Sequence, residues 1–192
     1  MLDALCINSL VKESAGLRDR IIFENVPSSH QFLTKLIQAI RDNRKVRVTY
    51  KGYTMGQEMT YELEPYFIRE FKRRWYLYAH KDYDKDHEPH MYALDRMSEM
   101  EILTETFEIP KSIDAEEWFS PLYGLRKYSD MKPERVLLKV SPMQTKYFRS
   151  LPLHRSQEEV ETHEDYSVFS YFLTIDYDFK QDLLSFGKEV EV

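Results

Sequence analysis

The sequence contains a single cysteine, few glycines and no long apolar run. Cys6 alone excludes an internal disulfide framework and any cysteine-based zinc cluster, and it fits a reducing compartment such as the cytoplasm. The 5 glycines and 8 prolines argue against a linker-rich or fibrous architecture. No apolar segment approaches the roughly 20 residues that a bilayer requires, and the N-terminus has no signal peptide pattern, so we expect no membrane partner.

Motifs of known catalytic chemistry are absent as well. The sequence has no GxSxG, no GxGxxG, no Walker-type glycine loop and no paired cysteine and histidine nucleophile. His80, His87 and His90 form the one histidine cluster, but they fall mostly in a hydrophilic loop without the spacing of a metal site. We therefore predict a protein that is not an enzyme and that has no metal or other cofactor.

Positive charge is concentrated in one short stretch. The chain as a whole carries a net charge of −6, whereas residues 40–81 carry +5 and residues 82–192 carry −11. An acidic remainder repels polyanions, so any anionic ligand is expected to bind within residues 40–81. A solvated basic face without a ligand is the alternative that charge alone leaves open.

The spacing of apolar residues changes from helical to strand-like near residue 45. Residues 31–43 predict a helix with Phe32 and Leu36 on its apolar face. Pro65 must lie at an edge or a bulge, because proline cannot donate a hydrogen bond to a sheet. A helix followed by several short-hairpin strands predicts a small antiparallel β-barrel or a strongly curved sheet, since closure removes exposed edges. The predicted strands are residues 45–50, 59–71, 74–80, 90–94 and 99–109.

A second pattern follows an irregular segment at residues 120–133. Its order is β-α-β-β-α-β, which is that of a ferredoxin-like unit, so the predicted fold class is α+β. Ser141-Pro142 is expected to begin the first helix of this unit, and Gly187 to end the second. The chain stops directly after the last predicted strand, which raises the suspicion of a truncated extension. The predicted elements are strands at 135–140, 158–163, 168–175 and 188–192 and helices at 141–150 and 179–186.

Aromatic and basic residues alternate in YFIREFKRRWYLYAH, residues 66–80. Guanidinium groups pair with phosphates and aromatic rings stack on bases, the combination used to bind single-stranded nucleic acid. On a strand, Trp75, Leu77 and Ala79 share a face that we assign to the core. The opposite face, with Arg74, Tyr76, Tyr78 and His80, is either a ligand-binding face or one side of a half-buried hairpin.

Two segments of this region resemble the WYL domain of bacterial transcriptional regulators. They are RRWYLYA, which contains the tripeptide Trp75-Tyr76-Leu77, and YALDRM at residues 92–97. The flanking segments TYKGY and YELEPYFIREF fit the same family. The resemblance covers roughly residues 30–125, and the tail that ends in LLSFGKEVEV is similar to the C-terminal extension that often follows a WYL domain.

The resemblance implies an Sm-like, SH3-like barrel that senses a ligand, in some members single-stranded DNA or another nucleic-acid-like effector. It divides the chain into a helical connector (1–30), a WYL domain (31–125) and the ferredoxin-like extension (126–192). Family members usually bind DNA through an N-terminal winged helix-turn-helix, which is missing from this sequence. Carried over by position, the ligand-binding surface of the family falls on Arg69, Arg74, Tyr76, His80 and Arg96.

Three functional hypotheses follow. In the first, the chain senses an anionic nucleotide-like or single-stranded nucleic-acid effector and passes the response to an attached DNA-binding domain. In the second, it is a dimerisation module without a ligand of its own, in which the basic stretch meets the acidic C-terminal region of a second copy. The third, an enzyme acting on nucleic acid, would need a metal or an acid–base pair near Arg96, and the spacing does not support it. A homodimer is compatible with the first two hypotheses.

Overall fold

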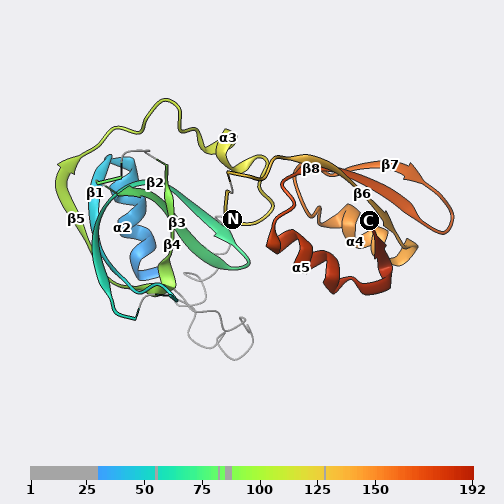
Figure 1. The fold of residues 1–192 in the computed structure, drawn as a ribbon, viewed down its shortest axis with the longest axis horizontal. Coiled ribbons are helices and arrows are strands. Elements are labelled where there is room, and N and C mark those ends of the chain that lie inside the picture. The colour runs from blue at the N-terminus through green and yellow to red at the C-terminus, as the bar shows by residue number, and fades with distance from the viewer. Residues whose placement is uncertain (1–29, 55, 82, 85–87, 128) are drawn as a thin grey trace, which may run out of the picture.

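The computed structural model describes residues 30–54, 56–81, 83–84, 88–127 and 129–192 (Figure 1). These residues form two α/β units, each built on an antiparallel sheet, and the segment between them contains the short helix α3 (Ala115–Phe119). The helical connector predicted for residues 1–30 lies outside the described residues except for its last position. In the described part of the chain, no helix is both long enough and apolar enough to cross a bilayer.

The first unit consists of one helix, five strands and a short 3-10 turn. Its strands pair antiparallel in the order β4-β3-β2-β1-β5. The predicted helix and the predicted strands are confirmed, with ends that differ by at most three residues. The elements are α2 (His30–Arg41), β1 (Arg44–Tyr50), β2 (Met59–Phe71), β3 (Arg74–Lys81), β4 (His90–Ala93), η1 (Leu94–Arg96) and β5 (Met97–Thr106).

The hairpin of β2 and β3 has a bulge at one end and a tight turn at the other. Its register shifts between Pro65 and Phe67, which confirms the predicted irregularity at the proline. At the turn, Lys72 and Arg73 both have positive φ angles, 46° and 64°. This left-handed conformation suits a two-residue hairpin but is strained for residues other than glycine.

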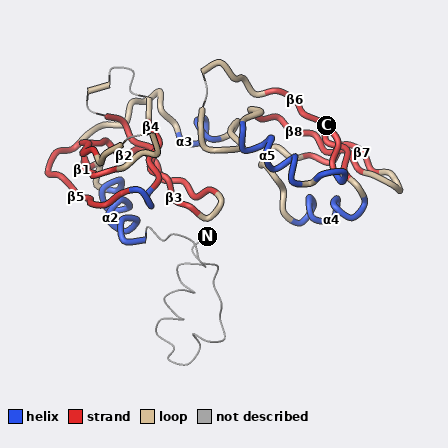
Figure 2. The backbone as a smooth tube through the Cα atoms, turned by 60° about the horizontal axis from the view of Figure 1, so that its bottom comes forward, coloured by secondary structure: helices blue, strands red, loops and turns tan. Residues whose placement is uncertain are grey.

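Helix α2 covers the apolar face of the first sheet (Figure 2). The predicted closed barrel is wrong: among the described strands, β4 and β5 are the two edges of an open sheet. The helix supplies the physical reason, because it buries the apolar face that closure would otherwise have to bury. The helix side chains in this core are Phe32, Leu33, Leu36 and Ala39, and they pack with Val46, Val48, Leu63, Leu77 and Ala79 of the strands.

The second unit has the predicted β-α-β-β-α-β order of elements. Its strands pair antiparallel in the order β7-β8-β6-β9. Both helices pack on the same side of this sheet, where Phe148 of the first helix and Phe179 of the second are buried (Figure 2). The elements are β6 (Glu134–Val140), α4 (Pro142–Ser150), β7 (Glu158–Thr162), β8 (Ser167–Leu173), α5 (Tyr177–Ser185), η2 (Gly187–Glu189) and β9 (Val190–Glu191).

Capping residues define the ends of the helices in this unit. Ser141 caps α4 ahead of Pro142, as the sequence predicts. Asp176 caps α5 by accepting a hydrogen bond from the amide of Phe179 at 2.8 Å, so that helix begins two residues earlier than predicted. Gly187, with φ of 55°, stands just past the end of α5 and confirms the predicted stop.

The segment that joins the two units is packed against both of them. Leu122 forms a parallel bridge with Thr174 of the second unit, and the amide of Gly124 donates to Asp176 at 2.8 Å. On the other side, the Tyr78 hydroxyl donates to the carbonyl of Leu125 at 2.6 Å. Residues 119–125, called here the strap, therefore hold the two units together, although the sequence predicts an irregular linker from residue 120 onward.

Candidate functional site

The five residues selected from the sequence lie in three different places. Arg74, Tyr76 and Arg96 lie near one another, at the start of β3 and in η1. Arg69 of β2 lines a cavity between the two units. His80, at the far end of β3, belongs to an internal polar network. The predicted single exposed face is therefore divided, and each part has a different chemistry.

His80 is buried and its ring is engaged on both sides. Nδ1 lies 3.0 Å from a carboxylate oxygen of Glu64, and Nε2 lies 2.7 Å from the carbonyl oxygen of Asp84. The ring also stacks on Tyr66, and Lys45 forms an ion pair with Glu64 at 3.3 Å. With only 3% of its surface exposed, His80 stabilises the first unit from within and does not face a ligand.

The strand face that alternation predicted to be open is covered by the strap. Tyr76 and Tyr78 are both buried, and the ring of Tyr78 meets that of Phe119 edge to face at 4.9 Å. Burial raises the pKa of Tyr78 to about 12. The alternation of residues along β3 correctly predicts two different faces. Helix α2 covers one face and the strap covers the other, so neither face meets solvent along its whole length.

Two guanidinium groups converge on Tyr53, in the loop between β1 and β2. The Arg96 guanidinium carbon lies 3.3 Å from the centroid of the Tyr53 ring. A hydrogen bond with Arg74, followed by the positive charge of Arg96, lowers the pKa of the Tyr53 phenol. Tyr53 remains 78% exposed, so most of this aromatic side chain is open to solvent. Sequence analysis includes Tyr53 in the TYKGY segment without assigning it to the site.

Asp95 completes this group, which we call the Tyr53 cluster (Tyr53, Arg74, Asp95 and Arg96). Its carboxylate lies 3.6 Å from the Arg74 guanidinium. Asp95 Oδ1 and Arg96 Nε are both buried, and neither has a hydrogen-bond partner among the described residues. A buried donor and a buried acceptor without partners cost free energy, about 1–3 kcal/mol each, unless a ligand or water satisfies them. A recess of about 420 Å³ opens at Tyr53, Asp95 and Arg96.

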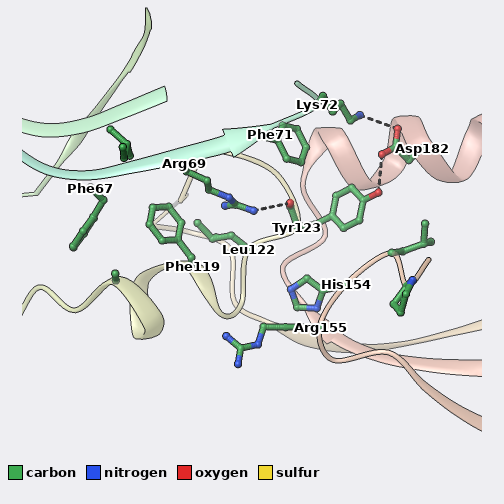
Figure 3. A pocket seen from close by; sticks show the side chains of 14 residues that line it. Phe67, Arg69, Phe71, Lys72, Phe119, Leu122, Tyr123, His154, Arg155 and Asp182 are labelled. Carbon is green, nitrogen blue, oxygen red and sulfur yellow. Dashed lines mark hydrogen bonds and ion pairs between the residues drawn. The ribbon is translucent and has the colours of Figure 1, made fainter. Parts of the chain in front are cut away.

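The cavity that Arg69 lines lies between the first unit, the strap and the second unit (Figure 3). Its volume is about 840 Å³. The guanidinium donates to the carbonyls of Gly124 at 2.8 Å and Tyr123 at 3.3 Å, and it lies 5.0 Å from the ring of Phe119 and 5.7 Å from that of Phe71. Among the described residues Arg69 has no carboxylate partner, and its charge is balanced by carbonyl dipoles, ring faces and a hydrogen bond with Tyr78. We call this space the inter-unit cavity.

Basic side chains from both units line the same cavity. Lys72 crosses from the β2–β3 turn to form an ion pair with Asp182 at 2.8 Å (Figure 3). His154 and Arg155 line the wall opposite Arg69, and Arg155 also forms an ion pair with Glu116. Burial, and then the charges of Arg155 and Arg69, lower the pKa of His154. No sequence motif marks His154 or Arg155, and only the fold brings them opposite Arg69.

Many other cations of residues 40–81 have acidic partners. Arg47 bonds Glu62 at 2.8 Å and Glu101 at 2.9 Å, on the exposed side of the first sheet. The net charge of +5 therefore does not form one open basic surface. Arg69 and Arg96 differ from Arg47, because no ion pair with a carboxylate is found for either within the described ranges.

The described residues offer no group of three or more histidine, cysteine, aspartate or glutamate side chains placed to hold a metal ion. His90 and Asp84 do form an ion pair at 2.8 Å. His87, the third member of the cluster noted in the sequence, lies outside the described residues.

The chain is similar over part of its length to proteins of known structure. No curated protein matches the chain. Among solved structures, the chain is similar to proteasome accessory factor B/C (PafBC) of Arthrobacter aurescens, with 18% identity and a TM-score of 0.42, and to a CRISPR Cas-related protein, with 17% identity and a TM-score of 0.45. Each similarity covers 84% of this chain, but the chain spans only 24% and 46% of the lengths of those two proteins.

The family comparison is confined to the first unit. The WYL domain family matches residues 31–102, which run from α2 into β5 and include all four members of the Tyr53 cluster. This range also contains both segments on which the resemblance was based. The chain therefore contains a WYL domain.

Proposed function

We propose that this chain is the ligand-sensing part of a transcriptional regulator, and that its WYL domain binds an anionic, nucleotide-like or single-stranded nucleic-acid effector at the Tyr53 cluster. The observation that carries the proposal is the convergence of Arg74 and Arg96 on one exposed aromatic ring. Guanidinium groups neutralise phosphate through charge-assisted hydrogen bonds, and an exposed ring accepts a stacked base.

The unpaired atoms of the cluster further restrict the chemical class of ligand that fits the site. Arg96 Nε supplies a donor and Asp95 Oδ1 an acceptor, and both are buried without a partner among the described residues. A ligand that combines an anionic group with a neighbouring donor, such as a hydroxyl or an exocyclic amine, satisfies both atoms. Nucleotides have this combination, whereas a simple inorganic anion lacks the donor.

Tyr76 has a supporting role in this proposal. It is buried beside Arg74, and although burial raises the pKa of its phenol, the charge of Arg74 and a hydrogen bond with it act in the opposite direction. Tyr76 is thus a positioning residue that orients Arg74. Of the remaining sequence candidates, Arg69 belongs to the inter-unit cavity and His80 to the internal network, and we assign neither to this site.

Regulation requires the ligand to distinguish two states of the protein. In this proposal the second unit is the ferredoxin-like extension of the family, and DNA is bound by a separate winged helix-turn-helix domain. The effector then changes DNA binding only if it has different affinities for the two states of the attached regulator. The Tyr53 cluster suits this task, because it combines a turn (η1), a strand end and a loop whose relative positions a ligand can fix.

The test is a fluorescence anisotropy titration of the whole chain with a labelled oligothymidylate of about ten nucleotides and, separately, with AMP as a competitor, at low and increasing salt. We expect saturable binding that weakens with salt, because phosphate contacts release counterions. Arg96→Gln should weaken binding by about tenfold or more and reduce the slope of log K against log salt by about 0.7.

Arg47→Gln is the matched control. Arg47 lies on the same sheet but is held by two glutamates, so its loss should change affinity by less than about twofold. Absence of binding at low salt, or equal losses for Arg96→Gln and Arg47→Gln, would contradict the proposal. Tyr53→Leu separates stacking from charge: it should weaken oligonucleotide binding while leaving the salt slope unchanged.

A homodimerisation module is the second candidate function. Met143 and Tyr147 of α4 and Leu151 just past its end are exposed and spaced four residues apart, so they lie along one face. A second copy of the chain would bury this stripe. Sedimentation velocity over a concentration series should then show a dimer that persists in high salt and that Tyr147→Glu dissociates. A monomer at all concentrations would exclude this function for the chain alone.

A further inference from the structure

We propose that the inter-unit cavity is a second ligand site, distinct from the Tyr53 cluster, and that it binds a small aromatic acid. Arg69 and Arg155 would hold the acidic group, and the phenylalanines of the cavity would hold the ring. The site has walls from both units and from the strap, so it exists only when the two units lie against each other (Figure 3).

The walls of the cavity select an aromatic guest. Phe67 and Phe71 come from β2 and Phe119 from α3, and they surround the space together with Leu122 and Leu153. The rings of Phe67 and Phe119 meet edge to face at 5.8 Å, a geometry that leaves ring faces available to a further ring. A volume of about 840 Å³ is within the range of small-molecule pockets.

The charges that line the cavity select an acid. Arg69, Lys72 and Arg155 line it, and among the described residues Asp182 is the one carboxylate in its lining and is already paired with Lys72. Arg155 also has an ion pair, with Glu116 outside the lining, so Arg69 is the cation of the cavity without a carboxylate partner in the described part of the chain. Arg69 uses one hydrogen-bond donor on each terminal nitrogen for the strap carbonyls and forms a further side-chain hydrogen bond with Tyr78, which leaves two of its five N–H groups for a ligand. The guest therefore needs a carboxylate or a similar group at one end.

His154 lies beside the two arginines and can report on the charge around them. Its Nδ1 accepts a hydrogen bond from the amide of Ser156 at 3.2 Å, so the neutral ring carries its proton on Nε2. Burial, and then the positive charges of Arg155 and Arg69, lower its pKa. An anion bound between these arginines would offset them and raise the pKa of His154, which makes this ring a local reporter.

The experiment uses 2-naphthoate as the probe and the whole chain as the protein. Calorimetric titration is combined with NMR of the histidine ring protons at several pH values. We expect saturable binding of 2-naphthoate, an upward shift of the His154 pKa on saturation, and binding at least about tenfold weaker for the uncharged analogue 2-naphthalenemethanol. Equal binding of the two compounds, or an unchanged His154, would overturn the proposal.

A variant that blocks the cavity avoids disturbing the strap. Ala115 is exposed at the start of α3 and lines the cavity, so Ala115→Trp should fill the space without removing any bond of Arg69. We expect it to weaken 2-naphthoate binding by about tenfold or more, while Ser112→Trp, an exposed position outside the lining, leaves binding unchanged. Equal binding by both variants would refute the site.

The two proposals fail separately. Arg96→Gln removes a member of the Tyr53 cluster and should leave 2-naphthoate binding intact, whereas Ala115→Trp should leave oligothymidylate binding intact. If Arg96→Gln abolishes 2-naphthoate binding and Ala115→Trp does not, the acid binds at the Tyr53 cluster and the inter-unit site is refuted. If oligothymidylate fails to bind but 2-naphthoate binds and responds to Ala115→Trp, the inter-unit site stands alone.

Discussion

The inter-unit cavity and the Tyr53 cluster each contain an arginine without a carboxylate partner among the described residues, and the two arginines are held differently. Arg69 donates to two main-chain carbonyls and lies beside two aromatic rings. Arg96 lies on the single exposed ring of Tyr53, and its buried Nε has no partner. Removing Arg69 leaves buried acceptors unpaired, whereas removing Arg96 leaves no such acceptor. The bonds of Arg69 to the strap thus contribute to stability, whereas the buried Nε of Arg96 has no such bond among the described residues.

The two regions also differ in how far apart their residues lie in the sequence. The Tyr53 cluster combines residues 53–96 of one unit, so its geometry depends on that unit alone. The inter-unit cavity combines β2, the strap, residues 152–155 and α5, so its geometry depends on how the two units meet. A ligand in the cavity would therefore depend on the arrangement of the units, whereas a ligand at the cluster would depend on the first unit alone.

The largest expected difference between the two regions is in stability. Arg69→Ala should lower the free energy of unfolding by about 2–4 kcal/mol, because it leaves the Tyr123 and Gly124 carbonyls unpaired and removes two cation–ring contacts. Arg96→Ala should change it by at most about 1 kcal/mol, since the buried Nε that it removes is already unpaired and the Tyr53 ring that it contacts is exposed. Urea denaturation followed by circular dichroism measures both. Similar losses of unfolding free energy for the two variants would contradict the claim that the two arginines are held differently.

The packing of the strap provides the next largest effect. A Cβ at Gly124 would lie 2.4 Å from Asp178 Oδ2 and 2.5 Å from Asp176 Oδ2, in the turn that caps α5. Gly124→Ala should therefore cost about 1–3 kcal/mol of stability. Gly56→Ala is the control, because no atom of the described residues lies within 4 Å of a Cβ at that position. If Gly124→Ala is as stable as the control, the strap does not hold the units in the way described.

Local patterns predicted most of the elements but not how their faces are covered. The period of the apolar residues was sufficient for α2, β1 and β3, and Ser141 and Gly187 fixed helix ends through capping that depends on neighbouring residues only. The closed barrel was wrong because α2 covers the apolar face of the sheet, and this is a tertiary contact. Burial of Tyr76 and Tyr78 depends on the strap, which follows about forty residues later without any periodic pattern.

The candidate sites were predictable to different degrees for the same reason. Arg96 lies in the segment YALDRM and Tyr53 in the segment TYKGY, and motif comparison identified both segments. It did not select Tyr53 as a site residue. His154 and Arg155 belong to no motif, and they meet Arg69 only because the two units pack together. A site made by the contact of two units leaves no spacing in the sequence from which it could be predicted.

A smaller effect concerns the turn that carries Lys72 across to the second unit. Its ion pair with Asp182 is partly exposed, so Lys72→Ala should lose at most about 1 kcal/mol, and less in high salt. Lys72→Gly removes the same ion pair but relieves the backbone strain at φ of 46°. The glycine variant should therefore be more stable than the alanine variant by about 1 kcal/mol in urea denaturation. Equal stability would mean that the turn is not strained.

The smallest expected effect is a dependence on pH that arises in the cavity and not at the cluster. Because the pKa of His154 is lowered in the folded protein, the unfolded chain binds more protons below about pH 6.5, and this residue's contribution to stability falls as pH falls through that region. His154→Gln removes the contribution, so the difference in unfolding free energy between wild type and variant should shrink or reverse from about pH 7.5 to about pH 5.5. Saturating 2-naphthoate should reduce this pH dependence, since an anion between Arg69 and Arg155 offsets the charges that disfavour the imidazolium. A pH dependence that survives in His154→Gln would place its origin elsewhere in the molecule.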